Sequence, residues 1–151
     1  VRVMLELAVS NLPGMQQDLD TEFLHDYRIC LRKIRSLLSL IKGVYPAEDL
    51  QRIRTILGDL ARQTNRLRDL DVYLLAREEH LGLLPPSFRP ALGRMFDDVT
   101  VEREHEIRRV VSKKSVSAAH RLLDIVSISC NNNELSGYAH AAELPVGPLV
   151  F

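Results

Sequence analysis

Apolar residues recur at intervals of three and four along most of the chain, which is the spacing of one face of an α-helix. The expected helices share this spacing and cover residues 1–10, 22–42, 47–79, 89–114 and 118–126. The Asn-Leu-Pro-Gly segment at 11–14 and the three asparagines at 131–133 end the first and the last of them. The sequence therefore predicts an all-α fold, an antiparallel helical bundle over residues 1–130 with a poorly ordered tail over 131–151.

One polar face of the helix at 22–42 carries a single sign of charge. His25, Arg28, Arg32 and Arg35 fall in one narrow stripe at about 100° per residue, and no carboxylate interrupts the stripe between Arg28 and Arg35. The opposite face is apolar and predicts burial of Tyr27, Cys30, Ile34, Leu37 and Ile41. The helix is amphipathic, and its polar face is a stripe of cations.

This basic stripe has two readings. Like charges four residues apart destabilise a helix by a few tenths of a kcal/mol, and solvated faces usually mix signs. A solvated basic face is the simpler explanation. A site for a polyanion is the other, and it is favoured because guanidinium groups bind phosphate oxygens in bidentate fashion.

Charge is distributed unevenly although the formal net charge is zero. Residues 28–68 hold ten Lys and Arg against three acids, and the rest of the chain holds ten against seventeen. Arg54 and Arg68, about four turns apart, lie on one flank of the helix that starts at residue 47. A local basic field of this kind steers anionic partners.

The sequence contains no motif that indicates another class of functional site. There is no glycine-rich phosphate loop, no metal-ligand spacing of Cys or His and no nucleophile motif, so no catalytic group, metal or cofactor is predicted. Two cysteines form no disulfide framework, and no apolar run is long enough for a bilayer, so a cytoplasmic protein with no membrane partner is expected. Nucleic acid is the rival polyanion, but no aromatic platform for bases lies among the arginines.

Two blocks of sequence resemble the CHAD domain, the conserved histidine α-helical domain. The first is Glu-Phe-Leu-His-Asp-Tyr-Arg at 22–28 with Arg32, Lys33 and Arg35, and the second is Arg-Asp-Leu-Asp-Val-Tyr-Leu-Leu at 68–75. The segments at 11–14 and 42–46 also resemble bacterial members of this family. The resemblance covers about residues 5–115, and the remaining tail departs from the family.

This resemblance implies two four-helix bundles around a central basic channel that binds inorganic polyphosphate, and association with polyphosphate granules. Its implied polyphosphate-binding residues here are His25, Arg28, Arg32, Lys33, Arg35, Arg54 and Arg68. Lys33 points off the stripe. The chain is expected to be the first half of such a domain, because no second basic helix follows residue 115.

Two functions follow from the resemblance. The first is non-enzymatic binding of polyphosphate. The alternative is an accessory module of a triphosphate- or polyphosphate-processing enzyme, in which His25 could accept a phosphoryl group. A half domain also leaves apolar surface uncovered, so a homodimer whose basic stripes share one ligand is expected.

Overall fold

The computed structural model describes residues 1–40 and 43–142, and every regular element in that part of the chain is an α-helix. This confirms the predicted all-α fold. In chain order the helices are α1 (Arg2–Gln16), α2 (Thr21–Leu40), α3 (Ala47–Gln63), α4 (Asn65–Leu75), α5 (Arg77–Leu83), α6 (Arg89–Val110) and α7 (Lys113–Ala142).

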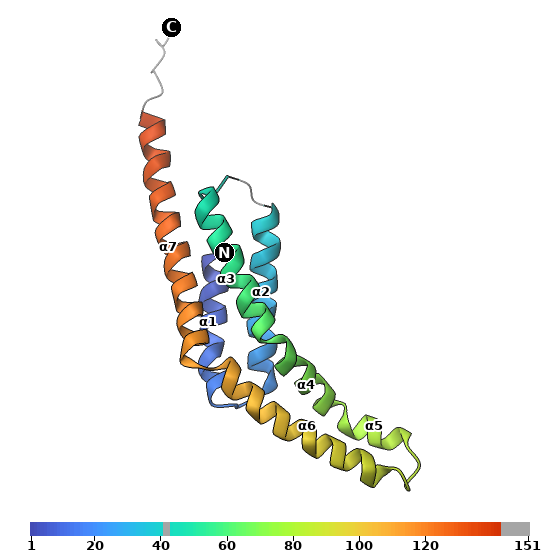
Figure 1. The fold of residues 1–151 in the computed structure, drawn as a ribbon. Coiled ribbons are helices and arrows are strands. Elements are labelled where there is room, and N and C mark those ends of the chain that lie inside the picture. The colour runs from blue at the N-terminus through green and yellow to red at the C-terminus, as the bar shows by residue number, and fades with distance from the viewer. Residues whose placement is uncertain (41–42, 143–151) are drawn as a thin grey trace.

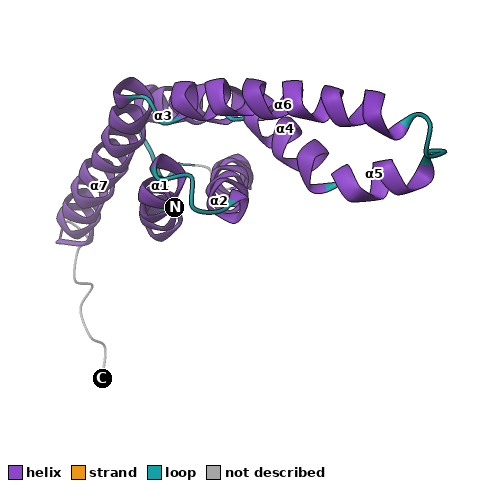
Figure 2. Ribbon diagram, turned by 90° about the horizontal axis from the view of Figure 1, so that it is seen from below, coloured by secondary structure: helices purple, strands orange, loops and turns teal. Residues whose placement is uncertain are grey.

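Four of these helices form an antiparallel bundle, and three form an arm. Helices α1, α2, α3 and α7 lie side by side, with α1 on α2 and α7, and α3 on α2 and α7 (Figure 1). Helices α4, α5 and α6, here called the arm, extend from the end of the bundle where α3 ends and α7 begins. Seen from below, α6 lies alongside α4 and α5 (Figure 2). The arm therefore joins the bundle through two connections at the same end.

The core lies between the bundle helices and takes the predicted apolar face of α2. Tyr27, Cys30 and Ile34 are buried as expected, and Leu37 is half-buried. Ile41 lies outside the described residues. Asp20 begins α2, since its side chain accepts a hydrogen bond from the Glu22 amide at 3.0 Å. Burial of the apolar face of α2 therefore turns the opposite, polar face outward.

The predicted break at residues 11–14 is wrong, because α1 continues to Gln16. Pro13 removes one backbone hydrogen bond near the end of the helix, and α1 tolerates that loss. Gly14 serves close packing, since a Cβ there would overlap the Phe23 ring. The chain turns instead at Asp18, which adopts a left-handed conformation with φ of 48°.

The prediction of a single long helix over 47–79 is also wrong. The chain forms α3, α4 and α5, with breaks at Thr64 and Ala76. At the first break the Thr64 hydroxyl donates to the Ala61 carbonyl at 2.9 Å and competes with the helical backbone for that acceptor. Periodicity carries no information about this local competition.

The last two helices differ from the expectation as well. The helix expected over 89–114 ends at Val110, and α7 runs through the three asparagines at 131–133 to Ala142. The expected tail over 131–151 therefore starts inside α7, and its residues 143–151 lie outside the described part of the chain. Ala119, Leu122 and Val126 are buried at helical spacing, so packing on the bundle supports α7.

Arg103 of α6 joins three parts of the molecule. Its Nη1 and Nη2 atoms donate to the two carboxylate oxygens of Asp18, each at 2.7 Å, and its Nε donates to Asp71 Oδ1 at 2.6 Å. Asp18 lies in the α1–α2 turn, whereas Asp71 lies on α4 and is 1% exposed. The guanidinium group therefore fixes both long helices of the arm to the bundle.

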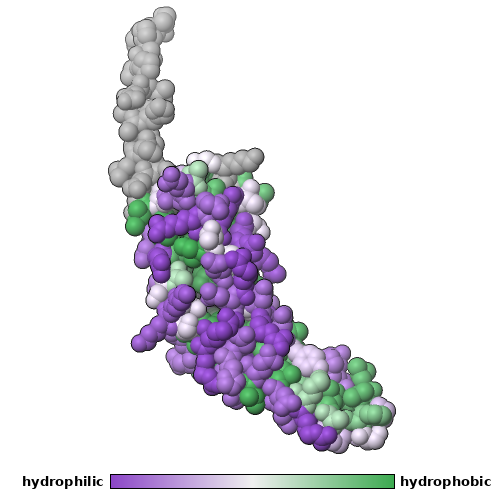
Figure 3. Space-filling model, in the orientation of Figure 1, coloured by the Kyte–Doolittle hydropathy of each residue, from purple (hydrophilic) through white to green (hydrophobic). Residues whose placement is uncertain are grey.

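The arm exposes apolar side chains. Val72, Leu75, Leu83 and Phe88 are all between 49% and 78% exposed, and Figure 3 shows hydrophobic residues gathered at the far end of the arm. The homodimer expected from the sequence stays a prediction. No helix within the described residues is long and apolar enough to cross a membrane.

Replacing Arg103 by Gln should destabilise the fold by about 3–5 kcal/mol, because it leaves the buried Asp71 carboxylate without its cation. Urea unfolding followed by circular dichroism measures this change. The matched control is Arg66→Gln, since Arg66 pairs with Glu102 on the surface and its loss should cost at most about 1 kcal/mol. Equal effects of the two changes would contradict the role given to Arg103.

The bridge should also make stability depend on pH. The hydrogen bonds from Arg103 hold the pKa of Asp18 below its usual range, so the stability it adds is present above the ordinary carboxyl pKa of about 3.9 and is lost as pH falls through the lowered value. Burial raises the pKa of Asp71, against the effect of its hydrogen bond with Arg103, and this shift has the opposite sign.

We therefore expect Asp18→Asn to be less stable than the wild type at neutral pH, and the difference to shrink below about pH 4. Urea unfolding at a series of pH values gives the two profiles. Parallel profiles down to acid pH would show that Asp18 contributes no such linkage.

Candidate functional site

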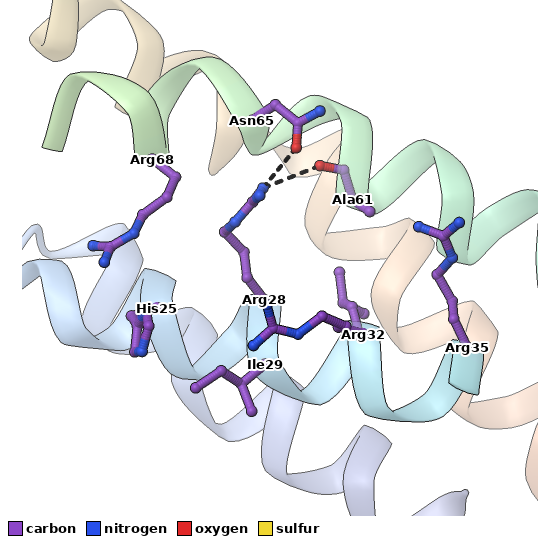
Figure 4. A pocket seen from close by; sticks show the side chains of 9 residues that line it. His25, Arg28, Ile29, Arg32, Arg35, Ala61, Asn65 and Arg68 are labelled. Carbon is purple, nitrogen blue, oxygen red and sulfur yellow. Dashed lines mark hydrogen bonds between the residues drawn. The ribbon is translucent and has the colours of Figure 1, made fainter. Parts of the chain in front are cut away.

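A groove opens between α2 and the junction of α3 with α4 (Figure 4). Its volume is about 290 Å³. Helix α2 forms one wall, and the last turn of α3 with the first turns of α4 forms the other. The lining residues are His25, Arg28, Ile29, Leu31, Arg32, Arg35, Ala61, Asn65 and Arg68.

The groove brings together five of the seven residues singled out from the sequence. His25, Arg28, Arg32 and Arg35 come from the polar side of α2, and Arg68 reaches down from α4 on the facing wall. Because Leu31 and Ile34 of α2 are held in the core, the stripe is held toward the groove. Burial of one side of α2 thus positions the cations on the other.

Arg28 crosses the groove and binds the opposite wall. Its Nη1 donates to Thr64 Oγ1 at 2.6 Å, to Asn65 Oδ1 at 2.9 Å and to the Ala61 carbonyl oxygen at 3.3 Å. Partial burial lowers the pKa of Arg28, and the nearby carboxylate of Asp69 opposes this shift. The group remains a cation at neutral pH, since arginine does not deprotonate in proteins.

Arg68 is held partly inside the protein. Its Nη1 atom is buried and makes no hydrogen bond to any described residue. The buried carboxylate of Asp71 feels its positive charge, which lowers the pKa of that carboxyl in opposition to burial. The arginine that is hydrogen-bonded to Asp71 is Arg103 of α6.

The groove arginines form no ion pairs with carboxylates of the described residues. Six other arginines form ion pairs within the described part of the chain, among them Arg66 with Glu102 and Arg109 with Glu106. No ion pair within the same residues includes Arg28, Arg32, Arg35 or Arg68. The groove therefore concentrates positive charge that an anion can neutralise.

Lys33 and Arg54 lie outside the groove lining. Lys33 borders a separate apolar hollow with Met4, Leu37 and Leu40. Arg54 Nη2 donates to the carbonyl oxygen of Leu38 at 3.0 Å, near the C-terminal end of α2. Arg54 thus ties α3 to the end of α2, an assignment that its spacing from Arg68 did not reveal.

Sequence reasoning missed the neutral half of the site. Ala61, Thr64 and Asn65 supply the acceptors for Arg28, and they lie together because α3 ends at Gln63 and α4 begins at Asn65. The adjacent Thr and Asn were the available signal, since both residue types favour helix ends. That signal was overridden by the apolar periodicity through this region.

The family model of the CHAD domain matches residues 2–143. The chain belongs to the CHAD domain family. The match extends well past residue 115, so the expected departure of the tail from the family is wrong up to residue 143. No curated protein matches the chain.

The arrangement of this CHAD domain suits binding of anions by charge and hydrogen bonds. The described residues contain no group of His, Cys, Asp and Glu arranged to hold a metal ion. The groove instead offers guanidinium donors from two helices, and Ile29 and Leu31 are apolar residues of its lining. Its chemistry matches the needs of phosphate oxygens.

An arginine that binds within the fold and an arginine of the groove lining should differ in how much each contributes to stability. Arg54→Gln removes a charged donor from the Leu38 carbonyl and should destabilise the fold by about 1–2 kcal/mol. Arg35→Gln removes an exposed cation that has no ion-pair partner among the described residues, so a change within about 0.5 kcal/mol is expected. Urea unfolding of both variants tests this, and a larger loss for Arg35→Gln would contradict the assignment.

Proposed function

We propose that this protein binds inorganic polyphosphate in the groove between α2 and the α3–α4 junction, without catalysing a reaction. The observation that carries the proposal is the gathering of four arginines from two helices, with no ion pair to any carboxylate of the described residues. Charge-assisted hydrogen bonds from guanidinium groups to phosphate oxygens are about twice as strong as neutral ones. Membership of the CHAD family supports the same ligand.

The length of the stripe favours a linear ligand over a single phosphate. His25 and Arg35 are ten residues apart on one helix, which corresponds to about 15 Å along its axis. An orthophosphate ion can contact only part of such a stripe. A chain of phosphates that runs along α2 can engage Arg28, Arg32 and Arg35 in turn while Arg68 contacts it from the facing wall.

The lining favours a polyanion without bases over nucleic acid. None of the nine lining residues is Phe, Tyr or Trp, so single-stranded bases have no stacking surface of that kind. A chain that carries only phosphates needs no such surface. Retention at polyphosphate granules follows from this binding.

The alternative role in a phosphate-processing enzyme centres on His25. Its position in the groove puts an imidazole near the path of the ligand. Nucleophilic catalysis also needs a base or an orienting group within hydrogen-bond reach, and the His25 ring makes no hydrogen bond to the other lining residues drawn in Figure 4. We therefore favour binding, and measurement of phosphate release alongside binding separates the two roles.

Replacing Arg32 and Arg35 together by Gln should weaken polyphosphate binding by several kcal/mol, since each charge-assisted hydrogen bond contributes about 1.5–3 kcal/mol. Wild-type binding should also fall steeply with salt, because bound arginines release counterions from the ligand. Titration calorimetry with inorganic polyphosphate at several salt concentrations measures both effects. Arg28 is left out of this variant because it also links α2 to the α3–α4 junction.

The matched control is the double variant Arg62→Gln with Arg66→Gln. It removes the same charge from α3 and α4, but both side chains lie outside the groove and pair with Asp59 and Glu102. The proposal is wrong if both double variants lose the same affinity, or if wild-type binding does not change with salt. Release of phosphate that His25→Gln abolishes would favour the enzymatic role.

A further inference from the structure

The guanidinium group of Arg28 is held by neutral acceptors only. Thr64, Asn65 and the Ala61 carbonyl receive its hydrogen bonds at 2.6, 2.9 and 3.3 Å. All three acceptors come from the α3–α4 junction, more than thirty residues along the chain. These bonds fix where the charge lies, and none of them comes from a carboxylate.

Arg103 shows the other way in which this fold anchors an arginine. Both of its partners, Asp18 and Asp71, are carboxylates, and their hydrogen bonds raise the pKa of Arg103. Arg28 shows the reverse shift, because partial burial lowers its pKa and only the more distant Asp69 opposes this. Carboxylates within the fold neutralise the charge of Arg103. The charge of Arg28 has no hydrogen-bonded carboxylate, so a ligand can still bind it.

We propose that Thr64 and Asn65 are positioning residues that hold Arg28 across the groove while keeping its charge free for the polyanion. This inference rests on the proposed function. It gives a role to the absence of charge on the acceptors at the α3–α4 junction. Neither the basic stripe nor the family match explains why these acceptors are neutral. A carboxylate at this place would occupy Arg28 and act as a built-in competitor of the ligand.

The residue types at the junction fit this role. The Thr64 hydroxyl accepts from Arg28 and donates to the Ala61 carbonyl at the same time, which Ser can also do and Val cannot. Thr64 is 2% exposed, so its hydroxyl is fixed by packing. Asn65 accepts through a neutral amide oxygen, and its aspartate analogue would accept at the same place with a negative charge.

Asn65→Asp separates charge from geometry. The change keeps the shape of the side chain and adds a carboxylate in the first turn of α4, where the helix dipole favours a negative charge, so the fold should be retained. We expect affinity for polyphosphate of one defined chain length to fall at least about tenfold at physiological salt. The slope of log affinity against log salt should fall by about one unit, because one cation no longer neutralises the ligand.

Gln51→Glu is the matched control for this charge change. Gln51 is exposed on α3, and it lies twelve residues before the end of that helix at Gln63, which corresponds to about 18 Å along the axis, beyond the screening length of about 8 Å. It should bind polyphosphate as the wild type does. The opposite change, Asp69→Asn, removes the carboxylate that acts on Arg28 and should raise the affinity.

Thr64 has its own pair of variants. Thr64→Ser should keep wild-type binding, and Thr64→Val should weaken it. Unchanged affinity and salt slope in Asn65→Asp would overturn the inference, as would a loss of affinity with an unchanged slope, which indicates a distorted groove. If the wild type itself binds no polyphosphate at low salt, the proposed function fails instead. If Asn65→Asp does not fold, a failure of Asp69→Asn to raise the affinity overturns the inference.

Discussion

The bridge from Arg103 to Asp18 and Asp71 is the interaction on which the arrangement of the rest depends. It joins α6 to the α1–α2 turn and to α4, through a carboxylate that is 1% exposed and another that is partly exposed. Asn65 and Arg68 lie on α4, so the second wall of the groove is set by the same contact. A buried carboxylate is costly unless its cation is in place, and this cost makes one position of the arm strongly preferred.

Some arginines of this fold pair with carboxylates and the groove arginines do not, and this difference bears on function. Six arginines outside the groove pair with carboxylates of the described residues, among them Arg103 and Arg66. Burial lowers the pKa of Arg28, Asp69 opposes this shift, and repulsion from Arg68 and Arg32 adds to it. No carboxylate of the described residues forms an ion pair with these arginines. Uncompensated repulsion weakens the free protein. A bound polyanion relieves it, which couples binding to stability.

The packing of the bundle also positions the cations of the groove. Burial of Tyr27, Leu31 and Ile34 fixes the rotation of α2 and so aims the stripe at the groove. Neutral acceptors at the helix break then fix Arg28 from the far side. A binding surface made of flexible cations loses entropy when each side chain is ordered. Arg28 and Arg68 are already restrained by the protein, so part of that ordering precedes the ligand.

The sequence by itself determined the helical class, the extent of α2 and the face on which His25, Arg28, Arg32 and Arg35 lie, because these depend on spacing within one helix. Only the tertiary structure decided that Arg68 faces the stripe, that Arg54 binds the end of α2 and that Arg103 braces the arm. It also decided the continuation of α7 through 131–133, against what the asparagines there indicated, whereas the break at Thr64 comes from a local hydrogen bond to the Ala61 carbonyl. Contacts between distant segments decide where Arg54, Arg68 and Arg103 lie, and such contacts leave no periodic trace in the chain, nor does a hydroxyl that competes for one carbonyl at Thr64.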